Sequence, residues 1–426
     1  MEYNALVIGA GPAGLTAAVT LANAGLQVQV IEAKAKPDFR VRAIGVTPPS
    51  LETFDAIGCA DALVARGTPV RQALVFDQTR LLHTLSFDGI HARFPFILSV
   101  PQGHTEAVLR EASAAYPNMG IVWGTEAVSL HVSMDGSPTV RTQDGRTMQA
   151  HHIVVCTGSA GTLQIENPFR LTKRYRHRFL IGDYPDTGVL GAQAVLVFTP
   201  DGSVESFPLA QGLRRWIVQL PTRYRNSTLD RVAADRHIRE RVAHRAGRVL
   251  RDSLPTGSPE WWSSFQPQRT ERSRFRIGNV LFAGDAAHTM SPIGGQGMNT
   301  GIADAELAAH LIAHEAGRLP PLRTAGGRPG ALPDYEAVRR RAYRAAANRA
   351  AVSMAVGAAT GRVASAVRSR VIRAALSRVP DKAIASHFAM LTIPGRRSAL
   401  SAAFNEYGQF HNPEEKEPRP LQSQAL

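Results

Sequence analysis

Two glycine-rich segments, almost three hundred residues apart, carry the residue types that can hold a dinucleotide. Glycine lets a backbone approach a pyrophosphate closely, and a helix N-terminus offers free N–H groups and a partial positive charge to phosphates. Together the two segments predict one dinucleotide held at both ends. The first segment reads Gly9, Ala10, Gly11, Pro12, Ala13, Gly14; the second reads Gly284, Asp285 and then Pro292, Ile293, Gly294, Gly295, Gln296, Gly297, Met298, Asn299.

The elements around the first segment form the βαβ unit that this glycine pattern requires. Residues 4–8 predict a buried parallel strand, residues 15–24 a helix rich in Ala and Leu, and residues 27–31 the next strand. Glu32 ends that second strand, with Ala33 beside it, and its carboxylate can accept hydrogen bonds from ribose hydroxyls. An acidic residue at this place favours FAD or NAD over NADP.

The second segment also begins at the carboxyl end of a predicted strand, residues 280–283. Asp285 can there accept a ribityl or ribose hydroxyl, because α/β sheets bind ligands at this edge. Pro292 and the glycines that follow it predict a loop that passes very close to a flat group. Residues 298–312 predict a helix whose N-terminus faces a flavin carbonyl or the charge of a reduced flavin. We therefore expect Pro292 and Gly294 to be catalytic residues at the reacting end of the cofactor.

With both segments in this order, the chain resembles the para-hydroxybenzoate hydroxylase-like FAD monooxygenases over roughly residues 1–350. The resemblance implies that Arg42, in the segment 40–45, meets the FAD phosphates. It implies that Gln102, after residues 98–101, contacts FAD, and that Arg215 is a catalytic residue near the mobile flavin. The segment that closes the flavin domain in this family is similar to Tyr335, Glu336, Arg339 and Arg340.

One segment departs from the family pattern. Family members carry an Asp-Gly pair after the strand near residue 155, followed by an Arg and a Ser, for contacts to the nicotinamide cofactor and the flavin pyrophosphate. Here Gly158 is kept and is predicted to bind FAD, whereas Thr157, Ala160 and Gly161 replace the Asp, the Arg and the Ser. FAD binding should persist through the other contacts. The usual reduction by NADH or NADPH lacks the Asp and the Arg that the family uses for it.

The implied fold is α/β, with a Rossmann-like FAD-binding domain of the glutathione reductase type interleaved with an antiparallel-sheet substrate domain. C-terminal helices follow, broken near Gly357, Gly361, Pro380 and Pro394. The predicted boundaries are 1–71, 102–174 and 270–333 for the FAD-binding domain, 72–101 and 175–269 for the substrate domain, 334–411 for the helical region and 412–426 for a disordered tail.

The resemblance implies an FAD-dependent monooxygenase that hydroxylates or epoxidises an aromatic or polyene-type specialised metabolite through a flavin C4a-hydroperoxide. NADH or NADPH is the expected reductant. The replacement at Thr157 and Ala160 leaves two alternatives open: reduction by a separate flavin reductase, or a non-redox cyclase in which FAD is structural. A third alternative is a binding protein or redox sensor that carries FAD as a ligand.

Composition limits the partners of the chain. The formal net charge is +14, and residues 334–400 hold thirteen Lys or Arg against three acids. This basic stretch fits either a solvated helix face or a docking face for an acidic carrier protein, and without a recognition fold it does not indicate nucleic acid. The two cysteines, Cys59 and Cys156, show no metal-ligand spacing and predict a reducing, cytoplasmic compartment. No apolar run is long enough for a membrane span, and the partner we expect is a small-molecule substrate.

Overall fold

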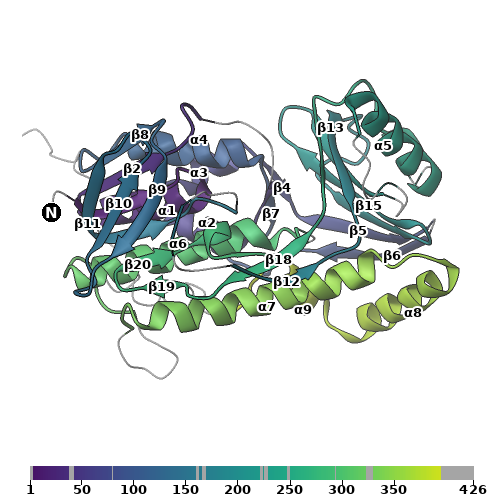
Figure 1. Ribbon diagram of the computed structural model, residues 1–426. Coiled ribbons are helices and arrows are strands. Elements are labelled where there is room, and N and C mark those ends of the chain that lie inside the picture. Colours follow the sequence, from purple (N-terminus) through teal and green to yellow (C-terminus); the bar gives the residue numbers. More distant parts are fainter. Residues whose placement is uncertain are drawn as a thin grey trace, which may run out of the picture.

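The computed structural model describes residues 3–37, 43–78, 80–159, 163–165, 169–220, 224, 229–246, 250–292, 294–322 and 330–394. Two large sheets dominate the described part of the chain, and long helices run beside them (Figure 1). Arg42, Ala160, Gly161 and the predicted tail at 412–426 lie outside the described residues. None of the described helices combines the length and the apolar character of a membrane span.

The first large sheet is mainly parallel and is built from strands that are distant in sequence. Its apolar strands are buried, which explains why they read as continuous hydrophobic runs. The helix α1 (Pro12–Asn23) packs on β1 and β11 and contacts α4 (Gln102–Ser113) and α6 (Gln296–Glu315). The strand order is β19 (Arg276–Ile277), β20 (Val280–Phe282), β11 (Thr147–Val155), β1 (Tyr3–Ile8), β2 (Val28–Glu32) and β8 (Met119–Trp123), with β9 (Ala127–Val132) and β10 (Pro138–Thr142) attached to β11.

The second large sheet has seven strands, and all but one of its neighbouring pairs are antiparallel. The parallel pair joins β5 to β14, because the chain leaves this sheet after β6 and returns to it by a long connection. The fold class predicted from the sequence is confirmed. The order is β17 (Trp261–Phe265), β13 (Phe179–Pro185), β16 (Leu213–Gln219), β15 (Gly202–Leu209), β14 (Ala194–Thr199), β5 (Gln72–Asp77) and β6 (Arg80–Ser86).

The two faces of the seven-stranded sheet pack against different helices (Figure 1). On one face Tyr184, Trp216 and Val218 form a buried core with Ile238 and Val242 of α5 (Arg231–Ala246). The opposite face meets two C-terminal helices. There Phe179 packs with Met354 of α7 (Asp334–Gly357), and Ala73, Leu85 and Ala194 pack with Ala385 of α9 (Asp381–Phe388).

The C-terminal helices break where glycine and proline predict. α7 ends at Gly357, α8 (Arg362–Arg378) begins after Gly361, and α9 begins after Pro380. Hairpins form at Gly136 and Gly145, and both glycines have positive φ. Cys59 and Cys156 are free and buried.

Two further three-stranded sheets were not predicted as sheets, because four of their six strands have only two or three residues and show no periodicity. They are β3 (Gly45–Val46), β7 (Ile97–Ser99) and β4 (Thr68–Val70), and β12 (Phe169–Arg174), β18 (Gln268–Arg272) and β21 (His288–Thr289). The helices α2 (Pro48–Asp55) and α3 (Ala60–Val64) lie between β3 and β4. The domain boundaries remain a prediction.

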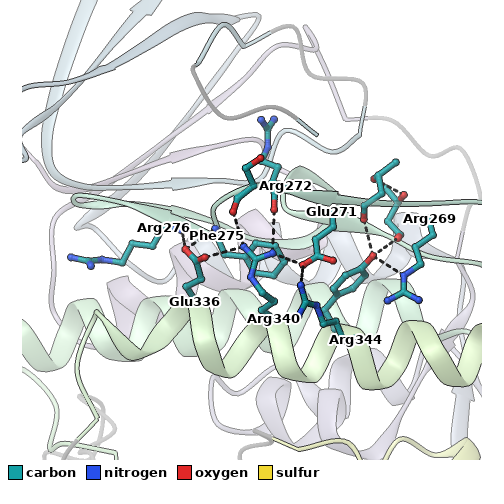
Figure 2. Close-up of polar contacts among 12 residues, drawn as sticks. Arg269, Glu271, Arg272, Phe275, Arg276, Glu336, Arg340 and Arg344 are labelled. Atoms are coloured by element: carbon teal, nitrogen blue, oxygen red, sulfur yellow. Dashed lines mark hydrogen bonds and ion pairs between the residues drawn. The ribbon is translucent and has the colours of Figure 1, made fainter. Parts of the chain in front are cut away.

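An ion-pair network fastens α7 to the strands that lead into the second glycine segment (Figure 2). Arg340 pairs with Glu271 of β18 and with Glu336 at 2.9 Å, and Arg344 reaches Glu271 at 3.0 Å. Glu336 also accepts a hydrogen bond from the backbone N–H of Phe275 at 3.1 Å. Part of the basic charge of residues 334–400 therefore serves internal packing.

Candidate functional site

Four parallel strands bring the predicted cofactor residues to one edge of the first sheet. β1, β2, β11 and β20 run in the same direction, so their carboxyl ends meet. Gly9 follows β1, Glu32 ends β2, Gly158 lies just beyond β11, and Asp285 lies just beyond β20. Asp285 and Ala33 are exposed, and Gly158 and Glu32 are half-buried. The structure thus gathers residues that the sequence separates by nearly three hundred positions.

The turn between β1 and α1 is tightly packed on its inner side and open on its outer side. A Cβ on Gly14 would overlap the carbonyl oxygen of Gly9 and would lie 3.3 Å from the Cβ of Cys156. A Cβ on Gly11, in contrast, would meet no protein atom within 4 Å. Gly11 is the N-cap of α1, Pro12 is its first residue, and no side chain caps this end. The helix N-terminus, with half-buried Ala13, therefore opens onto unfilled space.

The two glycine segments also touch each other directly. A Cβ on Gly284 would lie 3.4 Å from the Cβ of Ala13, and a Cβ on Gly301 of α6 would lie 2.9 Å from the Cα of Gly284. Small residues at these places let α1, α6 and the end of β20 approach closely. One molecule lying along this edge can therefore contact both segments.

Glu32 is held in place by the backbone around it. One carboxylate oxygen accepts a hydrogen bond from the N–H of Ala10 at 2.7 Å, and the other accepts one from the N–H of Lys34 at 3.0 Å. A carboxylate oxygen carries two lone pairs, so each retains acceptor capacity. The sequence predicted the residue, and its tie to the first glycine turn emerges only from the structure.

The loop before α6 exposes its backbone. Pro292, Gly294 and Gly295 are exposed, and the two glycines have φ of +86° and +65°, which favours glycine. Gly295 is the N-cap of α6, and no side chain caps it. Gln296 is buried, yet its Oε1 atom has no hydrogen-bond partner. Gly297 and Met298 are half-buried in the first turn, beside the exposed loop.

Asn299 and Gln102 make contacts within the protein. The Nδ2 group of Asn299 donates to the carbonyl of Gly45 at 2.9 Å, and its Oδ1 accepts from the N–H of Thr47 at 2.9 Å. Gln102 donates through Nε2 to Glu106 at 2.8 Å and accepts weakly from the N–H of Ala43 at 3.5 Å. Asn299 therefore ties the start of α6 to β3.

Behind the glycine edge lies a buried charge cluster that sequence reasoning missed. Asp304 of α6 binds Arg339 of α7 through Nε at 2.5 Å and His288 through Nε2 at 2.8 Å, and accepts the N–H of Gly284 at 3.0 Å. Burial alone would raise the pKa of Asp304, but Arg339 and His288 together hold it below its ordinary value. His288 stacks on Tyr343 with ring centroids 4.4 Å apart, which supports a structural histidine.

Arg215 lies away from the glycine edge, in the seven-stranded sheet. Its guanidinium forms a bidentate pair with Asp183 across β13 and β16, with Nε to Oδ1 at 2.7 Å and Nη2 to Oδ2 at 2.8 Å. Both residues are buried, and Arg215 also lies over the Trp261 ring at 5.0 Å. Its predicted catalytic role remains a prediction, and the partner Asp183 was not anticipated.

Glu205, a third acidic residue that the sequence did not reveal, is buried in the middle of β15. Burial raises the pKa of its carboxyl from 4.5 to about 7. The folded protein thus retains this proton at pH values where the unfolded chain releases it. The stability that this proton contributes is complete below the ordinary pKa and is lost as pH rises through about 7.

This titration predicts a pH-dependent difference between the wild type and Glu205→Gln. From about pH 5 to about pH 8, the free energy of unfolding of the wild type should fall by roughly 2–3 kcal/mol relative to the variant. Urea denaturation of both FAD-loaded proteins at several pH values measures this difference. A difference that does not change with pH would contradict the assignment.

The open groups at the glycine edge fit a flavin adenine dinucleotide. A phosphate binds well at an uncapped helix N-terminus with open space in front of it. The start of α1 is uncapped, and no protein atom fills the space over Gly11. The flat flavin ring needs a backbone that it can approach closely and polar groups that bind its ring atoms. The exposed loop before α6 supplies this backbone. The buried, unpartnered Oε1 of Gln296 is an acceptor beside this loop. The described residues therefore match the donors and acceptors of FAD.

Comparisons with known proteins agree with this geometry. Residues 2–350 match the family model described as FAD binding domain. The 6-methylpretetramide 4-monooxygenase of Streptomyces rimosus is 34% identical over 315 residues, which are 72% of this chain and 55% of that protein. The chain thus spans little more than half the length of this relative.

Two solved structures share the fold. A p-nitrophenol 4-monooxygenase from Pseudomonas putida matches with a TM-score of 0.76 and 22% identity, covering 92% of this chain and 98% of the other. A Diels-Alderase of pyrroindomycin biosynthesis matches with a TM-score of 0.71 and 23% identity, covering 90% and 80%. The chain belongs to the FAD-binding-domain family and, within it, to the para-hydroxybenzoate hydroxylase-like flavoproteins.

Proposed function

We propose that the chain uses FAD to hydroxylate or epoxidise an aromatic or polyene-type specialised metabolite. The observation that carries the proposal is the meeting of the two glycine segments at one sheet edge, with Gly284 packed against Ala13. The similarity to a 6-methylpretetramide 4-monooxygenase supports the oxygenation of an aromatic metabolite. Family membership supports oxygen transfer.

In this proposal the chain binds FAD along its edge by backbone groups. The N–H groups of Gly11, Ala13 and Gly14 at the start of α1 hold the pyrophosphate, which occupies the open space over Gly11. Glu32 and Ala33 lie at the ribose, and Gly158 and Asp285 lie along the ribityl and pyrophosphate region. Gln102, at the start of α4, adds a contact to FAD, and Arg42, which lies outside the described residues, is proposed to meet the FAD phosphates. The remaining proposed contacts lie at the flavin ring: Gly284, Pro292, Gly294, Gly295, Gln296, Gly297, Met298 and Asn299.

Reduced FAD supplies the oxygen chemistry, because it activates dioxygen and delivers one oxygen atom to an electron-rich ring or alkene. The chain's own contribution is electrostatic and steric. The uncapped start of α6 offers N–H groups that stabilise negative charge on the flavin. Arg215, held in place by its ion pair with Asp183, lies on the face of the sheet that meets α7 and α9.

The residues after β11 indicate which reductant delivers electrons to the flavin. Thr157 stands in the place of the family's aspartate, and Gly158 retains a φ of +72°. With the acidic anchor absent, we propose that direct reduction by NADH or NADPH is slow and that a separate flavin reductase delivers the electrons. An acidic partner of this kind would meet the basic surface of α7 and α8.

Stopped-flow reduction of the FAD-loaded protein tests this function. Under anaerobic conditions, NADH or NADPH should bleach the flavin slowly, and addition of a purified flavin reductase should accelerate bleaching at least tenfold. Admission of oxygen with an aromatic probe such as 1-naphthol should then yield a product heavier by one oxygen atom.

Two outcomes would redirect the proposal. A flavin that resists every reductant, dithionite included, would contradict oxygen transfer. Conversion of a substrate with oxidised FAD in the absence of oxygen would instead establish the alternative of a non-redox cyclase, in which FAD is structural. The lost aspartate at Thr157 is the observation that favours this alternative.

A further inference from the structure

Glu205 lies on the face of the seven-stranded sheet that turns away from α5. The strand register pairs it with Leu196 of β14 and Ile217 of β16, and directly opposed residues share one face of a sheet. Its neighbour Val204 belongs to the core with α5, on the opposite face. Glu205 therefore points to the side of the sheet that α7 and α9 cover.

That face is only partly covered around Glu205. Leu196, Phe207 and Ile217 are half-buried although they lie on central strands, whereas Val204 and Trp216 on the α5 face are 1% exposed. Ile217 packs toward the cluster of α7, and Leu196 and Phe207 pack toward the cluster of α9. Glu205 thus lies between the residue that packs toward α7 and the residues that pack toward α9. Leu196, Phe207 and Ile217 form a partly accessible apolar strip around it.

The carboxyl of Glu205 has no partner there. The residue is 8% exposed, and the described part of the chain records no hydrogen bond or ion pair to its side chain. Arg215, on the same face, is committed to Asp183. An unpaired polar group at this burial costs free energy, which a ligand can recover by donating a hydrogen bond. Burial also raises its pKa to about 7, consistent with an unpaired site.

A chain of contacts connects this strand to the glycine edge. Near the carboxyl end of β15, the carbonyl of Pro208 accepts a hydrogen bond from Ser99 of β7. β7 pairs with β3, whose Gly45 carbonyl is bound by Asn299 at the start of α6. The strand that carries Glu205 is therefore connected to the start of α6, where we propose that the flavin ring lies.

We infer that Glu205 recognises the substrate by accepting a hydrogen bond from a hydroxyl on a ring that lies over Leu196, Phe207 and Ile217. This inference rests on the proposed function and narrows it to hydroxylated substrates, such as phenols and enols. Glu205 is then a specificity residue, and the apolar strip supplies the contact surface for the ring.

A matched pair of probes isolates the hydrogen bond. 1-Naphthol keeps the donor that 1-methoxynaphthalene lacks on the same ring system. Each is titrated into the oxidised, FAD-loaded protein, and binding is followed by the change in flavin absorbance and by calorimetry, with no turnover. The wild type should bind 1-naphthol at least tenfold more tightly than the ether.

Glu205→Met removes the acceptor at similar volume, and Glu205→Gln keeps an acceptor oxygen. The methionine variant should lose tenfold or more in affinity for 1-naphthol and bind the ether within about twofold of the wild type. The glutamine variant should retain most of the preference. Glu240→Gln, on α5 with a side chain that is 63% exposed, is the matched control and should behave as the wild type.

The binding results distinguish a failure of the inference about Glu205 from a failure of the proposed function. A wild type that binds both probes equally, or a folded methionine variant that keeps the preference, overturns the inference about Glu205 alone. If the wild type binds neither probe, the aromatic substrate class of the proposed function is wrong, and the inference falls with it. If the methionine variant does not fold, equal binding of the two probes by the wild type still overturns the inference.

Discussion

Replacing Gly14 by alanine is expected to abolish FAD binding and to lower the free energy of unfolding by about 3 kcal/mol. The new Cβ would overlap the carbonyl oxygen of Gly9 and lie 3.0 Å from its carbonyl carbon, so α1 would be forced away from β1. Both groups belong to the backbone, and neither can move aside cheaply. Urea denaturation and flavin absorbance after reconstitution measure the two effects.

Gly11→Ala is the control that separates folding from cofactor binding. Its Cβ meets no protein atom within 4 Å, and its φ of −78° suits alanine. The free energy of unfolding of the FAD-free protein should therefore change by less than about 1 kcal/mol. FAD affinity should still fall at least tenfold, because the methyl group fills the space proposed for the pyrophosphate. Unchanged FAD affinity in this variant would show that the phosphates lie elsewhere.

Replacing Asp304 by alanine is expected to lower the free energy of unfolding by about 3–5 kcal/mol. The substitution leaves Arg339 buried with an uncompensated charge, since the side chains of this pair are 2% and 1% exposed. It also removes an acceptor from the N–H of Gly284 and a partner from His288. Urea denaturation of the FAD-loaded protein gives the value.

An exposed pair provides the control for this buried one. Asp61 binds Arg93 at 2.9 Å, but its side chain is 87% exposed, so Asp61→Ala should cost less than about 1 kcal/mol. Adding Arg339→Leu to Asp304→Leu should recover part of the loss, because it removes the buried charge. Equal costs for Asp304→Ala and Asp61→Ala would refute the role of the buried cluster.

Long, regular elements were predictable because their residues repeat a strong local signal. The apolar strand before Gly9, the helix α1 and the breaks at Gly357 and Pro380 all follow from local side-chain chemistry. α1 begins at Pro12, three residues before the predicted start, because proline suits the first position of a helix. The sequence order of the two glycine segments also sufficed to predict that they meet.

The polar interior was not predictable from one sequence. Asp304 looks like an ordinary acid within a helix, and its partners His288 and Arg339 lie 16 and 35 residues away. Glu205 stands beside Ser206 in a strand of mixed polar and apolar residues, so no local pattern marks it as buried. Asp183 and Arg215 meet only because the register of β13 and β16 places them opposite each other. Such pairs depend on tertiary geometry.

The flavin content of the unchanged protein shows whether the two glycine segments hold FAD. Purified protein is incubated with excess FAD, freed of unbound flavin and measured for absorbance in the blue region against protein concentration. We expect a yellow protein with one FAD per chain, and Gly11→Ala prepared in parallel should carry much less. A colourless wild type that cannot be reconstituted and shows no thermal shift with FAD would refute the proposal that the two glycine segments bind this cofactor.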